Sequence, residues 1–135
     1  MLPKGVILKT EKSILYWKNV TFHISVDEAQ IISQEIRNML KNHGIKAILV
    51  DNRHVGGAWP ADVNPIWSEL MTYLMTMIDK CATIASPVVV MQINRLSKHQ
   101  GTFEKIQAFS ELAEALHFIG VSDLSVLQKY VEIHS

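Results

Sequence analysis

The chain has 135 residues, equal numbers of basic and acidic residues, and one cysteine. This length fits a single domain with a buried core, and an apolar content of 48% excludes a disordered chain. No block of like charge and no long apolar segment occurs, so the composition argues against a nucleic-acid binder, a membrane span and an export signal.

The N-terminal segment predicts a hairpin. Residues 6–17, VILKTEKSILYW, contain two β-rich runs on either side of Glu11 and Lys12. Residues 20–24 are a candidate extension of the second strand. The turn lacks the favoured Asn-Gly or Gly-Gly pair, so the two apolar runs alone carry this prediction.

A helix is predicted after the hairpin. Ser25 stands three residues before Glu28, and this spacing can satisfy two free backbone donors at a helix start. Gly44 provides a left-handed stop at the other end. Apolar residues recur between these signals at the spacing of one helical face: Ala29, Ile32, Ile36, Met39 and Leu40.

The middle of the chain predicts a buried strand, a loop and a second helix. Residues 45–51, IKAILVD, are too apolar to alternate, so we expect a central strand of parallel type that is covered on both faces. The loop at 51–60, DNRHVGGAWP, leads into a helix that runs from about Asp62 or Pro65 to Lys80.

Cys81 is expected on the apolar side of that helix, as an inert core thiol. Because no intrachain disulfide can form, we expect a cytoplasmic protein. Residues 83–93, TIASPVVVMQI, predict a second buried strand, with Pro87 near its start where a missing donor does least harm.

The remaining elements are shorter. Residues 94–105 are a polar connection with room for one short helix, and 105–109 read as a third short strand. A helix capped by Ser110 ends at Gly120, and a final helix covers about 122–132. The whole order predicts a single α/β domain: a mixed sheet with an N-terminal hairpin and parallel central strands, with helices packed on the sheet.

Three segments resemble a known family. Residues 47–53 (AILVDNR), 82–92 (ATIASPVVVMQ) and 106–119 (IQAFSELAEALHFI) are similar to STAS-like domains, which are related to anti-sigma-factor antagonists. The likeness covers roughly residues 4–120 and extends in particular to small stand-alone bacterial members of unknown role. It implies a STAS-like fold and a regulatory protein that docks a protein partner through the loop and helix start after the central strand.

The sequence departs from this family at one point. Phospho-switched members carry Ser or Thr at the start of the helix after the central strand. The amides and the dipole of the helix end interact strongly with a phosphate at that position. Residues 51–66 contain no hydroxyl side chain, and Ser68 comes at least a turn too late. The resemblance therefore implies only the fold and a docking role for the loop and helix start after the central strand, without the phosphorylation switch.

The carboxyl ends of the two central strands are the candidate site, because ligands commonly bind there in parallel sheets. The guanidinium groups of Arg53 and Arg95, together with the helix-start amides, could form an anion pocket. Alternatively, Arg53 pairs with Asp51 or Asp62, and the glycines only permit a turn. The predicted binding surface consists of Arg53, His54, Gly56, Gly57, Trp59, Asp62, Asn94 and Arg95, with His99 as a further candidate.

The second helix carries more apolar surface than one sheet face needs. Met71, Tyr73 and Met75 predict an interface, most simply a symmetric dimer, with core packing or a bound lipid as alternatives. Trp59 either covers a buried Trp67 or is exposed as a docking residue.

Catalysis is the third possibility, through Asp51 and His54 as an acid–base pair. No nucleophile sits in a recognisable elbow, and the histidines lack metal-ligand spacing, so the sequence predicts no cofactor and no metal. We expect a non-enzymatic domain that binds a protein partner, and alternatively a protein that binds a small anion or an apolar ligand.

Overall fold

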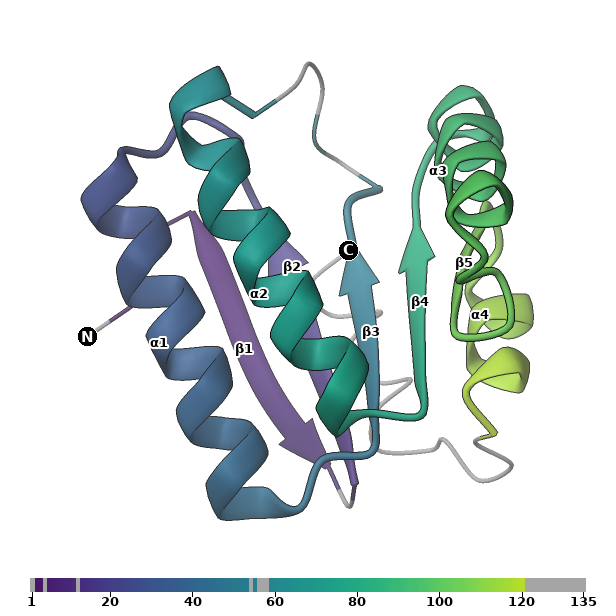
Figure 1. The fold of residues 1–135 in the computed structure, drawn as a ribbon, viewed down its shortest axis with the longest axis horizontal. Helices are drawn as coiled ribbons and strands as arrows, with labels where there is room; N and C mark the ends of the chain where they lie inside the picture. Colours follow the sequence, from purple (N-terminus) through teal and green to yellow (C-terminus); the bar gives the residue numbers. More distant parts are fainter. Residues whose placement is uncertain (1, 4, 12, 54, 56–58, 121–135) are drawn as a thin grey trace.

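The computed structural model describes residues 2–3, 5–11, 13–53, 55 and 59–120. Its strands form a five-stranded sheet in the order β1-β2-β3-β4-β5, in which β1 and β2 are antiparallel and all other pairs are parallel (Figure 1). This confirms the predicted mixed α/β sheet with an N-terminal hairpin. The elements are β1 (Val6–Glu11), β2 (Ile14–Asn19), α1 (Val26–His43), β3 (Ala47–Asp51), η1 (Ala61–Val63), α2 (Asn64–Met77), β4 (Lys80–Ile84), α3 (Pro87–Gln100), β5 (Ile106–Phe109) and α4 (Leu112–Phe118).

The ends of α1 are those that the sequence predicts. The Ser25 hydroxyl accepts a hydrogen bond from the Glu28 amide at 3.1 Å, and the Glu28 carboxylate accepts one from the Ser25 amide at 3.0 Å. The helix ends at Gly44, whose φ of 59° is left-handed. Both predicted signals are therefore confirmed.

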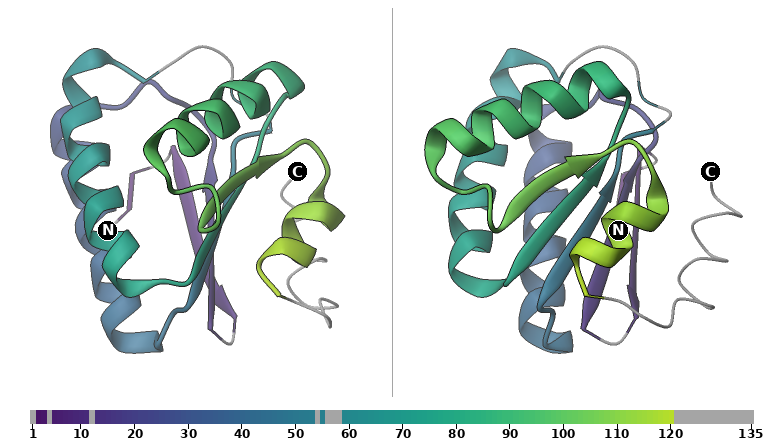
Figure 2. Two further views of the ribbon diagram at one scale, coloured as in Figure 1. Left: turned by 45° about the vertical axis from the view of Figure 1, so that its right-hand side comes forward. Right: turned by 90° about the vertical axis from the view of Figure 1, so that its right-hand side faces the viewer.

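The sheet is covered on both faces (Figure 2). Helices α1 and α2 lie on one face, where Ile48 and Val50 of β3 belong to their core cluster. Helix α4 lies on the opposite face and packs near Leu49 and Ala82. Because successive strand residues point to opposite faces, β3 needs apolar side chains at every position, as its sequence indicates.

The predicted strand at 83–93 is wrong. Strand β4 ends at Ile84, and Pro87 begins the helix α3 instead of a strand. A proline is well tolerated there, since the first helical amide has no intrahelical acceptor. The valine run favours a strand by propensity, but Val88 is 65% exposed, so the run is not the buried segment that its composition indicates.

Two boundaries move with this correction. Strand β3 pairs with β2 on one side and with β4 on the other, where Ala47 is opposite Lys80 and Asp51 is opposite Ile84. Residues 87–93 of the predicted strand lie in α3 instead. Helix α2 ends at Met77, so Cys81 lies in a strand and not in a helix. Its thiol is buried, which raises its pKa to about 12 and agrees with an inert core cysteine.

Three smaller predictions also change or stay open. Residues 20–24 do not extend β2, and α4 begins after Glu111 without the predicted side-chain cap from Ser110. Most of the predicted connection at 94–105 is the second half of α3. The predicted helix at 122–132 lies outside the described residues. Among the residues that are described, no helix is long and apolar enough to cross a membrane.

Helix α3 covers the outer edge of β5. The side chain of Asn94 donates to the carbonyl oxygen of Ala108 at 3.0 Å and accepts from its amide at 2.7 Å. Ser97 donates to the carbonyl of Ile106 at 2.7 Å. These side chains satisfy backbone groups of an edge strand that would otherwise be open to another chain. Because α3 is held at this edge, it lies apart from α2 (Figure 1).

Candidate functional site

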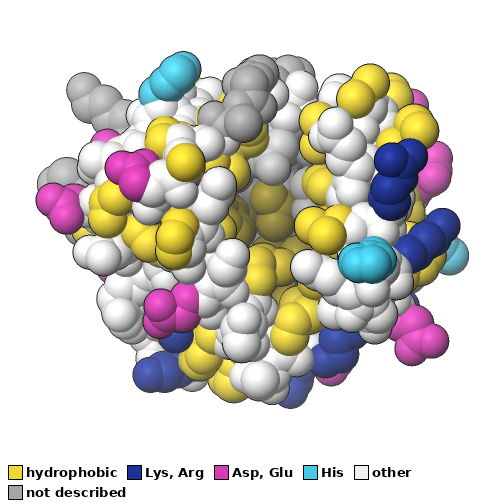
Figure 3. Space-filling view, turned by 45° about the horizontal axis from the view of Figure 1, so that its top comes forward, with side chains coloured by type: hydrophobic (Ala, Val, Ile, Leu, Met, Phe, Trp, Pro, Cys, Tyr) yellow, Lys and Arg dark blue, Asp and Glu magenta, His cyan; other side chains and the backbone are white. Residues whose placement is uncertain are grey.

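A cleft lies where β3 and β4 end, between the start of α2 and the first half of α3. It has a volume of about 330 Å³. In the space-filling view, the surface is hollowed at this end of the molecule, with hydrophobic side chains in the hollow (Figure 3). The lining residues are Phe22, Asn52, Arg53, Val55, Trp59, Asn64, Ala85, Ser86, Val89, Gln92 and Ile93.

The floor of the cleft rests on a buried network at the end of β3. Asp51 has no exposed surface and accepts a hydrogen bond of 2.6 Å from the Tyr16 hydroxyl. The Arg53 guanidinium donates to both carboxylate oxygens of Asp51, from Nε and Nη2, at 2.9 Å each. The predicted alternative in which Arg53 pairs with Asp51 is therefore the observed arrangement.

The protonation states of this network follow from its contacts. Burial opposes ionisation of Asp51, but hydrogen bonds from Arg53 and Tyr16 outweigh burial and lower the pKa of its carboxyl group. The bond to Asp51 raises the pKa of Arg53. Burial, and then the bond to Asp51, raises the pKa of Tyr16. At neutral pH the network therefore holds an ion pair and a neutral phenol.

A second network orients Asn52. Trp17 Nε1 donates to Oδ1 of the buried Asn19 at 3.0 Å, and Asn19 Nδ2 donates to Oδ1 of Asn52 at 2.7 Å. The Asn52 oxygen is engaged, whereas its Nδ2 donates to none of the described residues and can serve a ligand in the cleft.

Trp59 forms one wall of the cleft. Its ring lies 4.2 Å from that of Phe22 and 5.1 Å from that of Trp67, measured between centroids. Trp67 in turn lies 5.5 Å from Trp17. Trp59 is half-buried, so it both covers Trp67 and keeps part of its ring at the cleft surface.

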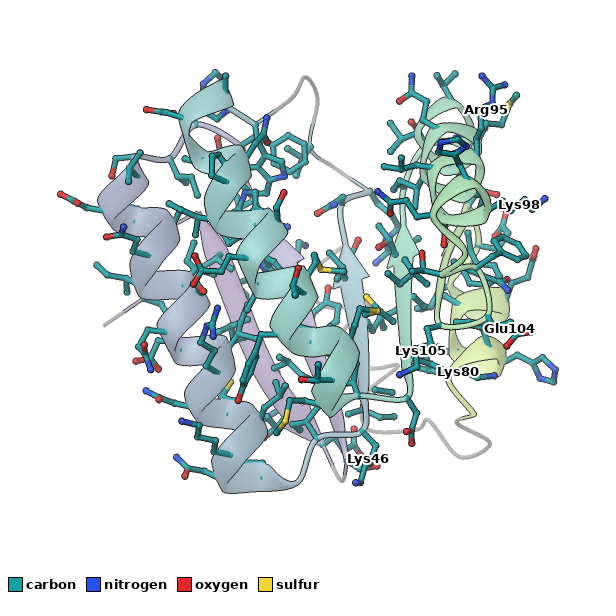
Figure 4. All side chains as sticks on the ribbon, viewed as in Figure 1. Lys46, Lys80, Arg95, Lys98, Glu104 and Lys105 are labelled. Atoms are coloured by element: carbon teal, nitrogen blue, oxygen red, sulfur yellow. The ribbon has the colours of Figure 1, made fainter. Side chains whose placement is uncertain are left out.

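The other predicted site residues fall elsewhere. Asn94 is bonded to β5, and Arg95 is exposed on α3, where its side chain projects away from α2 (Figure 4). The predicted anion pocket shared by the guanidinium groups of Arg53 and Arg95 is wrong, because it assumed a strand at 83–93 and Arg95 lies in α3. Asp62 is exposed in η1. His54, Gly56 and Gly57 lie outside the described residues. His99 is exposed in the last turn of α3.

The predicted interface residues of α2 do not form one surface. Met71 and Met75 are four residues apart and share one side of the helix, whereas Tyr73 lies on the opposite side. The Tyr73 ring packs against the Arg37 guanidinium of α1 at 4.5 Å. All three side chains are half-buried against the core, in agreement with the core-packing alternative.

Lys105, directly before β5, links this strand to the C-terminal end of α2. Its ammonium donates to the carbonyl oxygens of Met75 at 3.0 Å and Ile78 at 3.3 Å (Figure 4). A cation at a helix C-terminus is favourable, because the last carbonyl groups have no intrahelical donor.

Asp51 is poorly placed for acid–base catalysis. A general base must reach the proton of a substrate, whereas the Asp51 carboxylate is fully buried and bonded to Tyr16 and Arg53. Across the described part of the chain, no group of three His, Cys, Asp or Glu residues could hold a metal ion.

Sequence reasoning missed much of the lining because it assigned the α3 segment to a strand. Val89, Gln92 and Ile93 stand at helical spacing and together face the cleft. Pro87 was the sequence signal that could have indicated a helix start instead of a strand start, because proline is common at the first helical position. Asn52 was missed because only the fold brings it to Asn19.

Comparisons with known proteins identify the fold. No model of a known protein family matches the sequence, and no curated protein matches it significantly. The structure is similar to the crystal structure of an uncharacterized protein of the DUF3478 family, with a SpoIIAA-like fold, from Shewanella loihica PV-4. The two chains are 14% identical, and the match covers 84% of this chain and 91% of that chain with a TM-score of 0.64. The STAS-like resemblance is confirmed at the level of the fold, and this chain has a SpoIIAA-like, STAS-like α/β fold.

Proposed function

We propose that the protein is a non-enzymatic regulatory domain that binds a protein partner in the cleft between α2 and α3. The observation that carries this proposal is the position of Trp59, half-buried against Phe22 and Trp67 with part of its ring lining an open cleft. Aromatic residues held in this way are common anchors of protein interfaces, because a rigid ring loses little entropy on binding.

The chemistry of the cleft supports binding rather than turnover. The carboxylate beneath its floor, Asp51, is buried and already bonded to Arg53 and Tyr16. The loop and helix start also lack the hydroxyl residue that phospho-switched antagonists carry there. Regulation by this protein would therefore depend on partner binding alone, without a phosphate at that position.

Site-specific photocrosslinking in the native cell tests the proposal. A photoreactive amino acid replaces Gln92, which is exposed in α3 and lines the cleft. The control replaces Gln100, an exposed glutamine in the last turn of the same helix, outside the cleft. We expect one discrete protein adduct from position 92 that Trp59→Ala abolishes. Equal adducts from both positions, or none from position 92, would contradict a partner in the cleft.

Small-ligand binding is the second candidate, and the concavity of the site favours it. A volume of about 330 Å³ lies at the lower end of the range of ligand pockets. An anion or an apolar molecule that raises the melting temperature, with no protein adduct at position 92, would support this candidate. Val89→Trp fills the cleft without disturbing the Arg53–Asp51 pair and should remove the shift.

A further inference from the structure

We propose that the cleft takes an uncharged, extended peptide segment of the partner, held by its backbone amides and one apolar side chain. This rests on the proposed function, since it names the chemistry of the partner at the same site. Arg53 is the one charged residue among the described residues that line the cleft, and Asp51 already neutralises it.

The Arg53–Asp51 pair makes the cleft a poor anion site. The carboxylate binds two nitrogen atoms of the guanidinium at 2.9 Å each. A ligand carboxylate brought to Arg53 would be attracted by the guanidinium and repelled by Asp51, while it loses its own hydration. A ligand cation would also bind poorly, because no described lining residue is acidic and could pair with it. The balance of charge therefore favours a neutral occupant.

The polar lining is rich in amides. Asn52, Asn64 and Gln92 contribute carboxamides, and Ser86 contributes a hydroxyl group. The Asn52 oxygen is engaged by Asn19, and across the described chain the side chains of Asn64 and Gln92 form no hydrogen bond. A carboxamide offers both donors and acceptors, as does every peptide unit of an extended backbone. The lining thus matches a peptide backbone better than a group that only accepts or only donates.

The apolar lining provides room for one side chain. Trp59 and Phe22 stand on the α2 side, and Val89 and Ile93 stand on α3. Helix α3 packs mainly against β5, and Val89 of this helix is left 37% exposed at the cleft. An aliphatic side chain between these walls would be removed from water on both sides, which supplies affinity that neutral hydrogen bonds alone do not.

A matched set of three peptides tests this chemistry on the ¹⁵N-labelled full chain. The peptides share the sequence Ala-Leu-Ala: one is blocked at both ends, one has a free carboxylate, and one has a free amine. Binding is followed through the Val89 amide and the Trp59 indole resonances. We expect the blocked peptide to bind at least about tenfold more tightly than either charged peptide, which corresponds to the desolvation of one poorly compensated charge.

Variants locate the binding. Gln92→Leu removes an amide that forms no hydrogen bond with the described residues and should weaken binding of the blocked peptide, whereas Gln100→Leu, in the same helix and outside the cleft, should not. Asn52→Asp keeps the acceptor for Asn19 but removes the Nδ2 donor, which serves no described residue, and should weaken binding of the blocked peptide as well. Three results would overturn this inference: tighter binding of the free-acid peptide than of the blocked peptide, binding of N-methylacetamide as tight as that of the blocked peptide, or no shift of the Val89 and Trp59 resonances with any peptide. The crosslinking at position 92 would still decide the proposed function separately.

Discussion

The Tyr16 hydroxyl and the Asp51 carboxylate, in neighbouring parallel strands, lie 2.6 Å apart, and neither residue has exposed surface. Arg53 closes this network from the rim of the cleft, where its side chain is 23% exposed. The same contacts therefore stabilise the centre of the sheet and position the first residues of the loop that follows β3. Stability and the shape of the cleft are coupled through these three side chains.

Replacement of Tyr16 by phenylalanine tests the central hydrogen bond. The substitution keeps the ring and leaves a buried carboxylate without one donor. We expect the free energy of unfolding to fall by about 1.5–3 kcal/mol, the range for hydrogen bonds to charged groups. Urea denaturation at neutral pH measures this loss. Tyr73→Phe is the control, since its ring packs against Arg37 and its hydroxyl makes no hydrogen bond within the described chain. Equal losses in the two variants would contradict the assignment.

Alkaline pH provides a second test of Tyr16. Burial and the bond to Asp51 raise its pKa in the folded state, so the neutral phenol contributes stability. This contribution is fully present below the ordinary tyrosine pKa of about 10 and is lost as the pH rises above it, because the unfolded chain ionises first. We expect stability above about pH 10 to fall more steeply in the wild type than in Tyr16→Phe. Parallel slopes in denaturation series would show that Tyr16 is not the group responsible.

The ion pair should be strongly coupled. Arg53→Met leaves the buried Asp51 without its cation, and we expect a loss at the lower end of about 3–5 kcal/mol, since Arg53 keeps some exposure. The double variant Asp51→Asn, Arg53→Met removes both charges and should lose less stability than the sum of the single variants. Additive losses in urea denaturation would argue against the pair.

The same ion pair predicts a dependence on acidic pH. Because the pKa of Asp51 is lowered in the folded state, the wild type should lose stability as the pH falls below the ordinary aspartate pKa of about 4.

Local signals in the sequence predicted the first half of the fold well. The Ser25–Glu28 capping box, the stop at Gly44 and the apolar run of β3 each act within a few residues, and all three are confirmed. They are reliable because they satisfy backbone groups or bury side chains whatever the rest of the chain does.

The failure at residues 83–93 has a tertiary cause. Propensity favours a strand for a run of valines, but Asn94 and Ser97 complete the edge of β5 only when this segment is helical. The sequence placed one side of the candidate site at the end of β3, and the cleft lies there. It did not identify the other side of the cleft, because the lining residues Val89, Gln92 and Ile93 come together only in the helix α3.

A dimer through α2 remains a prediction. Of the three residues chosen from the sequence, Tyr73 packs against α1, so the interface would have to form over Met71 and Met75. A glutamate at position 75 would place a charge in that contact and should convert a dimer to a monomer. Sedimentation equilibrium of the wild type and Met75→Glu measures the mass. A wild type that stays monomeric at high concentration would rule out this interface.

The last prediction concerns Asn94, which was chosen from sequence as a ligand-binding residue and instead bonds to both backbone groups of Ala108. Asn94→Leu keeps the approximate size and removes both bonds, so the amide and carbonyl of an edge strand lose their partners. We expect a loss of about 1–3 kcal/mol, the cost of leaving a buried polar group unsatisfied. Hydrogen exchange of the Ala108 amide should accelerate, while exchange in β3 changes only by the global loss of stability. Because this strand edge would then be open to other chains, the variant should also aggregate more readily on warming than Gln92→Leu, which alters an exposed side chain of the same helix that forms no hydrogen bond to β5. Unchanged exchange at Ala108 would contradict the role of Asn94 in closing the edge.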